Sequence, residues 1–355
     1  MEIRKLVPSE HGRTRKLYET VFYQDETRFV DYYYTCKTRN NVIYVAEDEK
    51  GIHAMLHLNP VKVCWNGKTE TIYYIVAVAT EQEYRHQGLM RRLLGQSLQE
   101  LYEQQAPYVF LMPASEAIYT PFGFRRAWEW RWEEEMVSGS NFPDSEEDAP
   151  LKAAAVHQEK NGWHPAEKLS EQQLQELSSH VNTVLSEQFQ MFVQRSPEYY
   201  RNLDREQRAS GGQLEILFAE GDGQKGTHSS DIPITSRCTA KEKFPNMMTR
   251  IIHLESFNHP LKSEEEKTFY WQVKDELLPG NNGCFEIKLT PTGGEVNRLT
   301  EQECEFGETC RLTERNGELE KKRDVQSLKE VNISEIPELL ENSNPFLHTM
   351  ISEVV

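Results

Sequence analysis

The sequence predicts a mixed α/β protein with more than one domain. The chain has 355 residues, more than one core of ordinary size needs, and its 37% of hydrophobic and 27% of charged residues are typical of globular proteins. An apolar, β-branched run at residues 72–79 predicts a buried strand, and leucines at helical spacing from Leu89 to Leu101 predict an amphipathic helix after it. A short apolar run at 108–112 ends at Pro113 and predicts a second buried strand.

The residues before this unit predict two helices and several antiparallel strands. We expect a first strand at residues 2–7 and helices at 10–21 and 27–36. The pair Asn66-Gly67 is a strong hairpin signal. It follows the last of three expected antiparallel strands, at residues 42–46, 51–58 and 61–65.

Composition shifts mark the later part of the chain. Residues 138–150 are polar, acidic and contain proline, which predicts a linker that ends the first domain. Ser170 and Gln173 have capping-box spacing, so a helix is expected from Ser170 to Met191. From Phe244 onward the pattern favours a compact α+β unit, with strands at 248–254, 284–289 and 294–298 and a charged helix at 263–273.

Charge and cysteine usage narrow the classes of partner. The formal net charge of -17 argues against nucleic acid and favours cationic ligands. The six cysteines form no CxxC pair, so we expect no metal site and reduced thiols. The N-terminus lacks a signal-peptide pattern and no apolar run is long enough to span a bilayer, so a cytoplasmic protein without membrane contact is expected.

The turn between the 72–79 strand and the next helix has the features of a phosphate cradle. A helix N-terminus offers unpaired backbone N–H groups and a positive dipole end. Gly88 at this point carries no Cβ that would block a pyrophosphate. An ordinary strand-to-helix connection is the alternative interpretation.

Motifs on both sides of Pro113 resemble the GNAT N-acetyltransferases. Arg85 and Gly88 fit the family's motif A, although Met90 stands where glycine or alanine is usual. Tyr119 and Gly123-Phe124 match a Tyr-x-x-x-Gly-Phe element whose tyrosine faces the thioester sulfur in that family. Without the resemblance, Tyr119 would be interpreted as a core tyrosine beside a turn.

The C-terminal region resembles a narrower group, the enhanced-intracellular-survival (Eis) acetyltransferases. The resemblance lies in the apolar ending of residues 344–355 and in the strands near 247–254 and 285–289. It implies three domains: a catalytic GNAT domain at 1–137, a degenerate GNAT-like domain at 151–244 and a sterol-carrier-like domain at 245–355.

The resemblance also implies a cosubstrate and roles for individual residues. Acetyl-CoA would be the acetyl donor, with no metal, and Tyr119 would protonate the departing thiolate. The C-terminal carboxylate of Val355 would be the base; Glu81, Glu116 or a bound water are the alternatives. The cofactor-binding residues would be Val78 and Thr80 on the strand, and Arg85, His86, Gln87, Gly88, Leu89, Met90 and Arg91 in the loop and helix.

The preferred function is therefore acetyl-CoA-dependent transfer of an acetyl group to a primary amine of a cationic small molecule, either aminoglycoside-like or a polyamine. Acetylation of peptide or protein lysines is one alternative, and a non-catalytic lipid or sterol carrier is another. Trp128, Trp130 and Trp132 alternate on one strand face, which, together with the family's hexamers, predicts a homo-oligomer.

Overall fold

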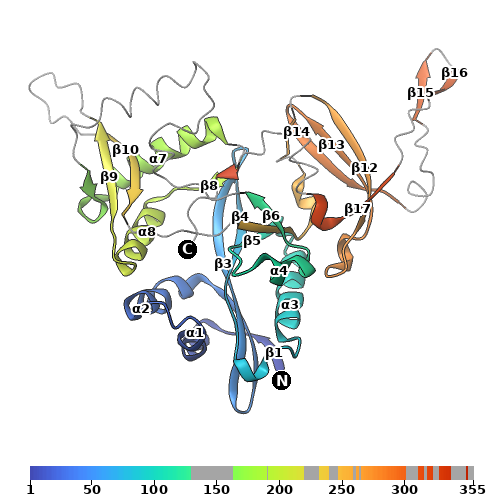
Figure 1. Cartoon of the computed structure of the whole chain (residues 1–355). Coiled ribbons are helices and arrows are strands. Elements are labelled where there is room, and N and C mark those ends of the chain that lie inside the picture. Colours follow the sequence, from blue (N-terminus) through green and yellow to red (C-terminus); the bar gives the residue numbers. More distant parts are fainter. Residues whose placement is uncertain are drawn as a thin grey trace, which may run out of the picture.

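A mixed sheet of nine strands is the largest in the described part of the chain (Figure 1). The structure is a computed structural model, and it describes residues 1–128, 163–189, 191–219, 232–239, 247–258, 261–263, 265–300, 311–315, 318–322, 328–336 and 349–350. The expected linker at 138–150, Trp130, Trp132 and Val355 lie outside these residues. The predicted mixed α/β class is confirmed.

Seven strands of this sheet lie side by side in the order β1-β2-β3-β4-β5-β11-β6. Neighbours are antiparallel, except that β4 and β5 are parallel. β3 is one continuous strand through Pro60, where two shorter strands were expected. The bounds are β1 Glu2–Lys5, β2 Val42–Asp48, β3 Gly51–Trp65, β4 Lys68–Thr80, β5 Tyr108–Leu111, β6 Arg125–Trp128 and β11 Met247–Ile251.

Helices cover both faces of this sheet. α1 (Arg15–Val21) and α2 (Thr27–Thr35) pack on one face, and α3 (Leu89–Glu103) packs its leucines on the other. The helix expected at 10–21 has α-helical geometry only from Arg15, because Pro8–Thr14 forms the 3-10 helix η1. Gly12 within η1 lowers helix propensity at this point.

β11 brings a distant part of the chain into the N-terminal sheet. It lies between β5 and β6, with Arg250 opposite Val109 and Met248 opposite Arg126. All five of its residues are buried, as expected for a central strand. The division expected at residue 245 assigns this strand to the third domain, whereas its pairing is with the first; the other domain boundaries stay a prediction.

The residues of the expected second domain form a helix pair and a small antiparallel sheet, ordered β10-β9-β7. Ser170 caps α7 through the predicted capping box, but α7 ends at Gln188 because residues 191–193 form β8. β8 pairs with the end of β3, and β18 (Thr349–Met350) pairs with β8. The bounds are β7 His164–Pro165, α7 Glu171–Gln188, β8 Met191–Val193, α8 Pro197–Ala209, β9 Leu214–Ala219 and β10 Ile232–Cys238.

The C-terminal unit contains a four-stranded sheet ordered β14-β13-β12-β17. The helix expected at 263–273 is wrong, because this segment contains strand β12 (Lys267–Lys274). Trp271 and Val273 alternate with exposed residues and are buried, which is the period of a strand. The other strands are β13 Gly283–Thr290, β14 Gly293–Arg298, β17 Lys329–Asn332 and the separate hairpin β15 Arg311–Arg315 with β16 Glu318–Lys322.

Short 3-10 helices join these elements: η2 Lys37–Asn40, η6 Ala166–Lys168, η7 Leu254–Phe257, η8 Pro279–Asn281 and η9 Ile333–Glu335.

Cys36 and Cys64 carry free thiols, as expected, but Cys284 is disulfide-bonded, which corrects the expectation of reduced thiols throughout. No helix in the described ranges has the length and apolar character needed to cross a membrane.

Candidate active site

The sheet opens between β4 and β5. These parallel strands pair only at Tyr73 with Val109 and Tyr74 with Phe110, although β4 continues to Thr80. At Ala77 the backbone has φ +52° and the register with β3 shifts, which marks a β-bulge that bends β4. The half-buried Val78 lies beyond the bulge, so this end of β4 has a backbone edge that β5 does not use.

The predicted phosphate cradle follows this edge. After Thr80 come the 3-10 helix η3 (Gln82–Tyr84), an exposed loop at residues 85–88, and α3. Gly88 is the N-cap residue with φ +74°, a left-handed conformation that glycine adopts without strain. The first turn of α3 contains no acidic residue, so its unpaired amides and dipole are free to attract an anion.

The side chains around the cradle divide into two groups. Leu89 is buried and Met90 packs partly against the core beneath α3, which explains why a residue larger than glycine or alanine is tolerated there. Arg85, His86, Gln87 and Arg91 are exposed. The guanidinium of Arg91 lies 5.0 Å from the ring centre of Phe122, and Nε of Arg85 donates to the Thr80 carbonyl at 3.2 Å.

Tyr119 ends the short helix α4 (Glu116–Tyr119), which leads through η4 (Thr120–Phe122) to Gly123. Its side chain is buried and meets the ring of Phe124 edge-on, with ring centres 5.9 Å apart. Burial raises the pKa of Tyr119 to about 12. The hydroxyl is therefore protonated at neutral pH, as a proton donor must be.

Two residues that the sequence analysis did not single out lie on the α2 side of the opening. Burial raises the pKa of the Tyr74 hydroxyl, and the charges of Glu206 and Tyr119 raise it further. Glu206, on α8, is buried and accepts hydrogen bonds from Tyr32 Oη at 3.0 Å and Lys37 Nζ at 2.7 Å. A carboxylate from the second unit is thus buried against the first, a placement that local sequence patterns do not reveal.

The alternative bases already have partners. Glu81 Oε2 lies 2.7 Å from Nδ1 of His53, and Glu116 Oε1 accepts from Arg126 at 2.5 Å. Val355 lies outside the described residues, but β18 brings Thr349 and Met350 beside β8. Five further residues can extend at most about 17 Å.

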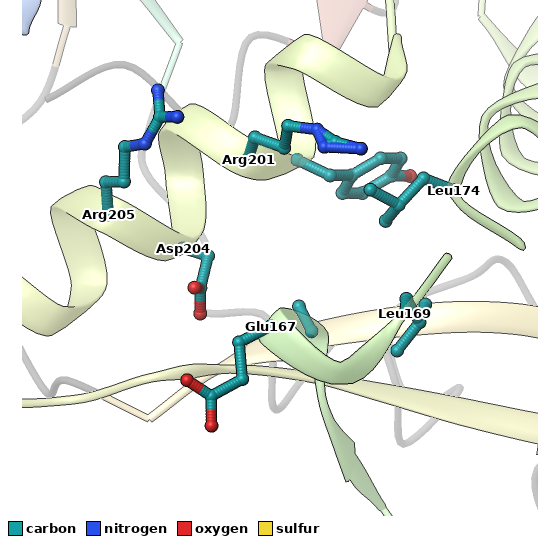
Figure 2. A pocket seen from close by; sticks show the side chains of 8 residues that line it. Glu167, Leu169, Leu174, Arg201, Asp204 and Arg205 are labelled. Carbon is teal, nitrogen blue, oxygen red and sulfur yellow. The ribbon is translucent and has the colours of Figure 1, made fainter. Parts of the chain in front are cut away.

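The structure also contains a separate cavity of about 220 Å³ in the second unit (Figure 2). In Figure 2, Arg201 and Arg205 on α8 lie across from Glu167 and Leu169. None of the described residues predicted for the site lines this cavity. Arg201 is already paired with Glu171, and charges of both signs line the walls, so no role in acetyl transfer is assigned to it. Nor do the described residues contain a group of three or more metal-ligating side chains.

These features define an α/β domain with a splayed parallel strand pair, a glycine-capped helix at the splay and a neutral tyrosine nearby. Residues 2–127 match the acetyltransferase (GNAT) domain. The chain therefore contains a GNAT acetyltransferase domain, and the expectation of a GNAT acetyltransferase is confirmed. The match ends within β6 and does not include β11.

Solved structures share the fold over most of the chain. A probable N-acyltransferase from Enterococcus faecalis is 16% identical, with a TM-score of 0.55 over 84% of this chain and 85% of that one. A GCN5-related N-acetyltransferase from Kribbella flavida is 10% identical, with a TM-score of 0.56 and coverage of 84% and 85%. Eis1 from Mycobacterium abscessus is 12% identical, with a TM-score of 0.53 and coverage of 84% and 86%. At these identities the likeness concerns the fold. No curated protein sequence matches the chain.

Proposed function

We propose that the protein transfers an acetyl group from acetyl-CoA directly to a primary amine of a cationic small molecule. The observation that carries the proposal is the partial β4–β5 pairing, which leaves the end of β4 open directly before the glycine-capped start of α3. The match of residues 2–127 to an acetyltransferase domain supports it.

The open end of β4 would hold the pantetheine arm. Its amides would pair with the backbone of Val78 and Thr80, as in the family that the sequence resembles. The pyrophosphate would accept from the amides of residues 86–90, and the exposed side chains of Arg85 and Arg91 would add positive charge. The protein supplies binding and orientation, and acetyl-CoA supplies the activated acyl group.

The chemical step needs one acid and one base. The neutral amine attacks the thioester carbonyl, a C–N bond forms, and the C–S bond breaks. Tyr119 gives its proton to the departing thiolate, because its raised pKa keeps the hydroxyl protonated. The Val355 carboxylate would take the proton that the amine loses. Burial of that carboxylate among apolar groups would raise its pKa and make it a better base.

A cationic acceptor agrees with the charge of the whole chain. The formal net charge is -17. Aminoglycoside-like compounds and polyamines carry the several amines that such a field attracts. We also propose a cytoplasmic homo-oligomer without a nucleic-acid partner; a single monomeric mass in light scattering at micromolar concentration would refute the oligomer.

A panel of amines tests the proposal directly. Polyamines, aminoglycosides and a lysine peptide are each incubated with acetyl-CoA, and free thiol is measured over time. We expect release of thiol with at least one small polyamine-like acceptor and weaker release with the peptide. Calorimetry with acetyl-CoA and with a sterol runs in parallel. Binding of the sterol without binding of acetyl-CoA would replace this function by that of a lipid carrier.

A further inference from the structure

A buried ion pair connects the C-terminal unit to the strand beside the candidate site. Arg250 lies on β11, and its Nη2 donates to Asp275 Oδ1 at 2.7 Å. The two side chains are 1% and 2% exposed. Such a pair adds little net stability, since desolvation offsets the attraction, but loss of one partner is strongly destabilising.

The carboxylate of Asp275 is held by the turn that follows β12. Its Oδ1 accepts from the backbone amides of Leu277 and Leu278, both at 3.0 Å, and its Oδ2 accepts from Asn281 Nδ2 at 2.9 Å. Asn281 is fully buried and also donates to the carbonyl of Ile252 at 2.9 Å. These bonds fix the position of the carboxylate independently of Arg250.

The guanidinium of Arg250 lies directly against Gly123. A Cβ added at Gly123 would clash with Nη1 of Arg250 and lie 3.3 Å from its Cζ, so any side chain there would force the guanidinium to shift. Gly123 has φ +83° and closes the turn after Tyr119, because its amide donates to the Thr120 carbonyl at 3.0 Å. The next residue, Phe124, is fully buried and packs against the ring of Tyr119.

We propose that Arg250 is a positioning residue for Tyr119: held by Asp275, it supports the Gly123 turn and so fixes the tyrosine hydroxyl at the open end of β4. The C-terminal unit thereby sets the geometry of the reaction without touching the substrate. The proposal rests on the role of Tyr119 under the proposed function, and it adds a residue that neither motif contains.

The test uses Arg250→Lys and Asp275→Asn, with Lys288→Gln as the control. Lys288 belongs to the same unit, and its Nζ lies 2.9 Å from Oε2 of Glu286 on the same strand, a pair that does not involve the turn holding Asp275. One readout is thiol release with the best amine of the panel. The other needs no acceptor: 3-fluorotyrosine is placed at position 119, and its fluorine NMR shift and titration are followed.

We expect both Arg250→Lys and Asp275→Asn to lower kcat by about 10- to 100-fold, the scale of a small misplacement of a catalytic group. The KM for acetyl-CoA should stay within about twofold, because the cradle is not altered. The fluorine signal should shift or broaden in both variants and stay unchanged in Lys288→Gln. Arg250→Lys keeps the charge. A loss of kcat without a matching fall in melting temperature therefore indicates positioning.

A double-mutant cycle tests the contact itself. Gly123→Ala adds a Cβ that contacts Arg250, and the alanine is also strained at the positive φ of this position. The strain is common to both backgrounds, so it cancels in the cycle. We expect Gly123→Ala to reduce kcat less in the Arg250→Lys background than in the wild type.

Equal fluorine spectra in Arg250→Lys, Asp275→Asn and the wild type would overturn the proposal, as would additive effects in the cycle. If Arg250→Lys does not fold, the proposal is tested with Asp275→Asn instead, both alone and in a double-mutant cycle with Gly123→Ala. If Tyr119→Phe leaves turnover unchanged while the fluorine signal responds to Arg250→Lys, the general acid is refuted and the positioning of the turn is retained.

Discussion

Gly88 and Tyr119 are the residues at which local sequence and structure agree most directly. Gly88 has the positive φ that a side chain disfavours, and no heavy atom lies within 4 Å of the place a Cβ would take. Tyr119 is buried, and its pKa is raised as an acid in a water-poor site requires. Both could be singled out from the sequence because each belongs to a short motif beside an apolar strand, and their roles stay predictions.

Replacement of Gly88 by alanine should weaken acetyl-CoA binding. A non-glycine residue in the left-handed region costs about 1–2 kcal/mol, and the loop must keep this conformation to bind, so affinity should fall about 5- to 30-fold. Gly95→Ala is the control: Gly95 lies inside α3 with open space around it, so the same change should keep affinity and stabilise the helix. Calorimetry measures both. Equal affinities in the two variants would exclude Gly88 from the cradle.

Tyr119→Phe should reduce turnover by about 100- to 10,000-fold, the usual contribution of a general acid, with little change in acetyl-CoA affinity. Since the pKa is about 12, loss of the Tyr119 proton should not limit turnover until strongly alkaline pH. Tyr108→Phe is the control, because Tyr108 is also buried but its hydroxyl donates to the sulfur of Met191 instead. Similar turnover in Tyr119→Phe and Tyr108→Phe would remove Tyr119 from the mechanism.

At the scale of elements, a histidine joins the end of β4 to the hairpin between β2 and β3. His53 Nδ1 lies 2.7 Å from Glu81 Oε2, its Nε2 lies 2.8 Å from Asp48 Oδ1, and Tyr84 stacks on the ring at 3.9 Å. Burial lowers the pKa of His53, but the two carboxylates outweigh it, so the pKa is raised. Through its contact with Glu81, the ring joins β3 to the start of the cradle loop, and protonation of the ring strengthens this contact.

The contacts of His53 with Glu81 and Asp48 predict a pH dependence of stability and of acetyl-CoA affinity. The folded pKa is above the unfolded value, so the stabilisation is complete below about pH 6.5 and is lost as the pH rises through the folded pKa. The difference in unfolding free energy between wild type and His53→Gln should shrink as the pH rises above about 6.5 and through the folded pKa, and the advantage in acetyl-CoA affinity should shrink with it. Chemical denaturation and calorimetry across this range measure both. A constant difference would show that His53 does not hold the loop through its charge.

Elements were predictable where their pattern is local. The period of the leucines indicated α3, and the Ser170 capping box indicated α7. The segment at 267–274 was misassigned, because its charged residues hid the alternation of Trp271 and Val273. Arg250 could not be recognised as a neighbour of Gly123, since only the pairing of β11 with β5 and β6 brings the two together.

At the scale of the whole molecule, the three units are joined by shared strands and a shared core. One apolar cluster includes Tyr74 and Phe110 of the first sheet, Met191 of β8 and Trp271 of the C-terminal sheet. β18, the last described segment of the chain, pairs with β8, and β8 pairs with β3. The proposed role of Val355 depends on this position of the C-terminal segment.

An extension of a few residues after Val355 should lower turnover about as much as Tyr119→Phe does, because the carboxylate is displaced from the amine. Acetyl-CoA affinity should be unchanged. The two lesions combined should cost less than the product of their separate effects if both groups serve one proton-transfer path. Thiol release by the single and double variants measures this. An extended chain with wild-type turnover would redirect the search for the base to a bound water.

The position of β11 has a consequence for synthesis of the chain. While the ribosome is still making residues 129–246, β5 and β6 lack the strand that lies between them, and an open apolar edge of this kind recruits strands from other molecules. A chain cut after Trp128 should therefore pellet on centrifugation although it contains the complete matched domain, and a separately added peptide of residues 245–258 should keep part of it in solution. A fragment that stays monomeric without the peptide would show that the edge is protected in another way. If the fragment pellets, the newborn chain needs protection of this edge until residues 247–251 have been made.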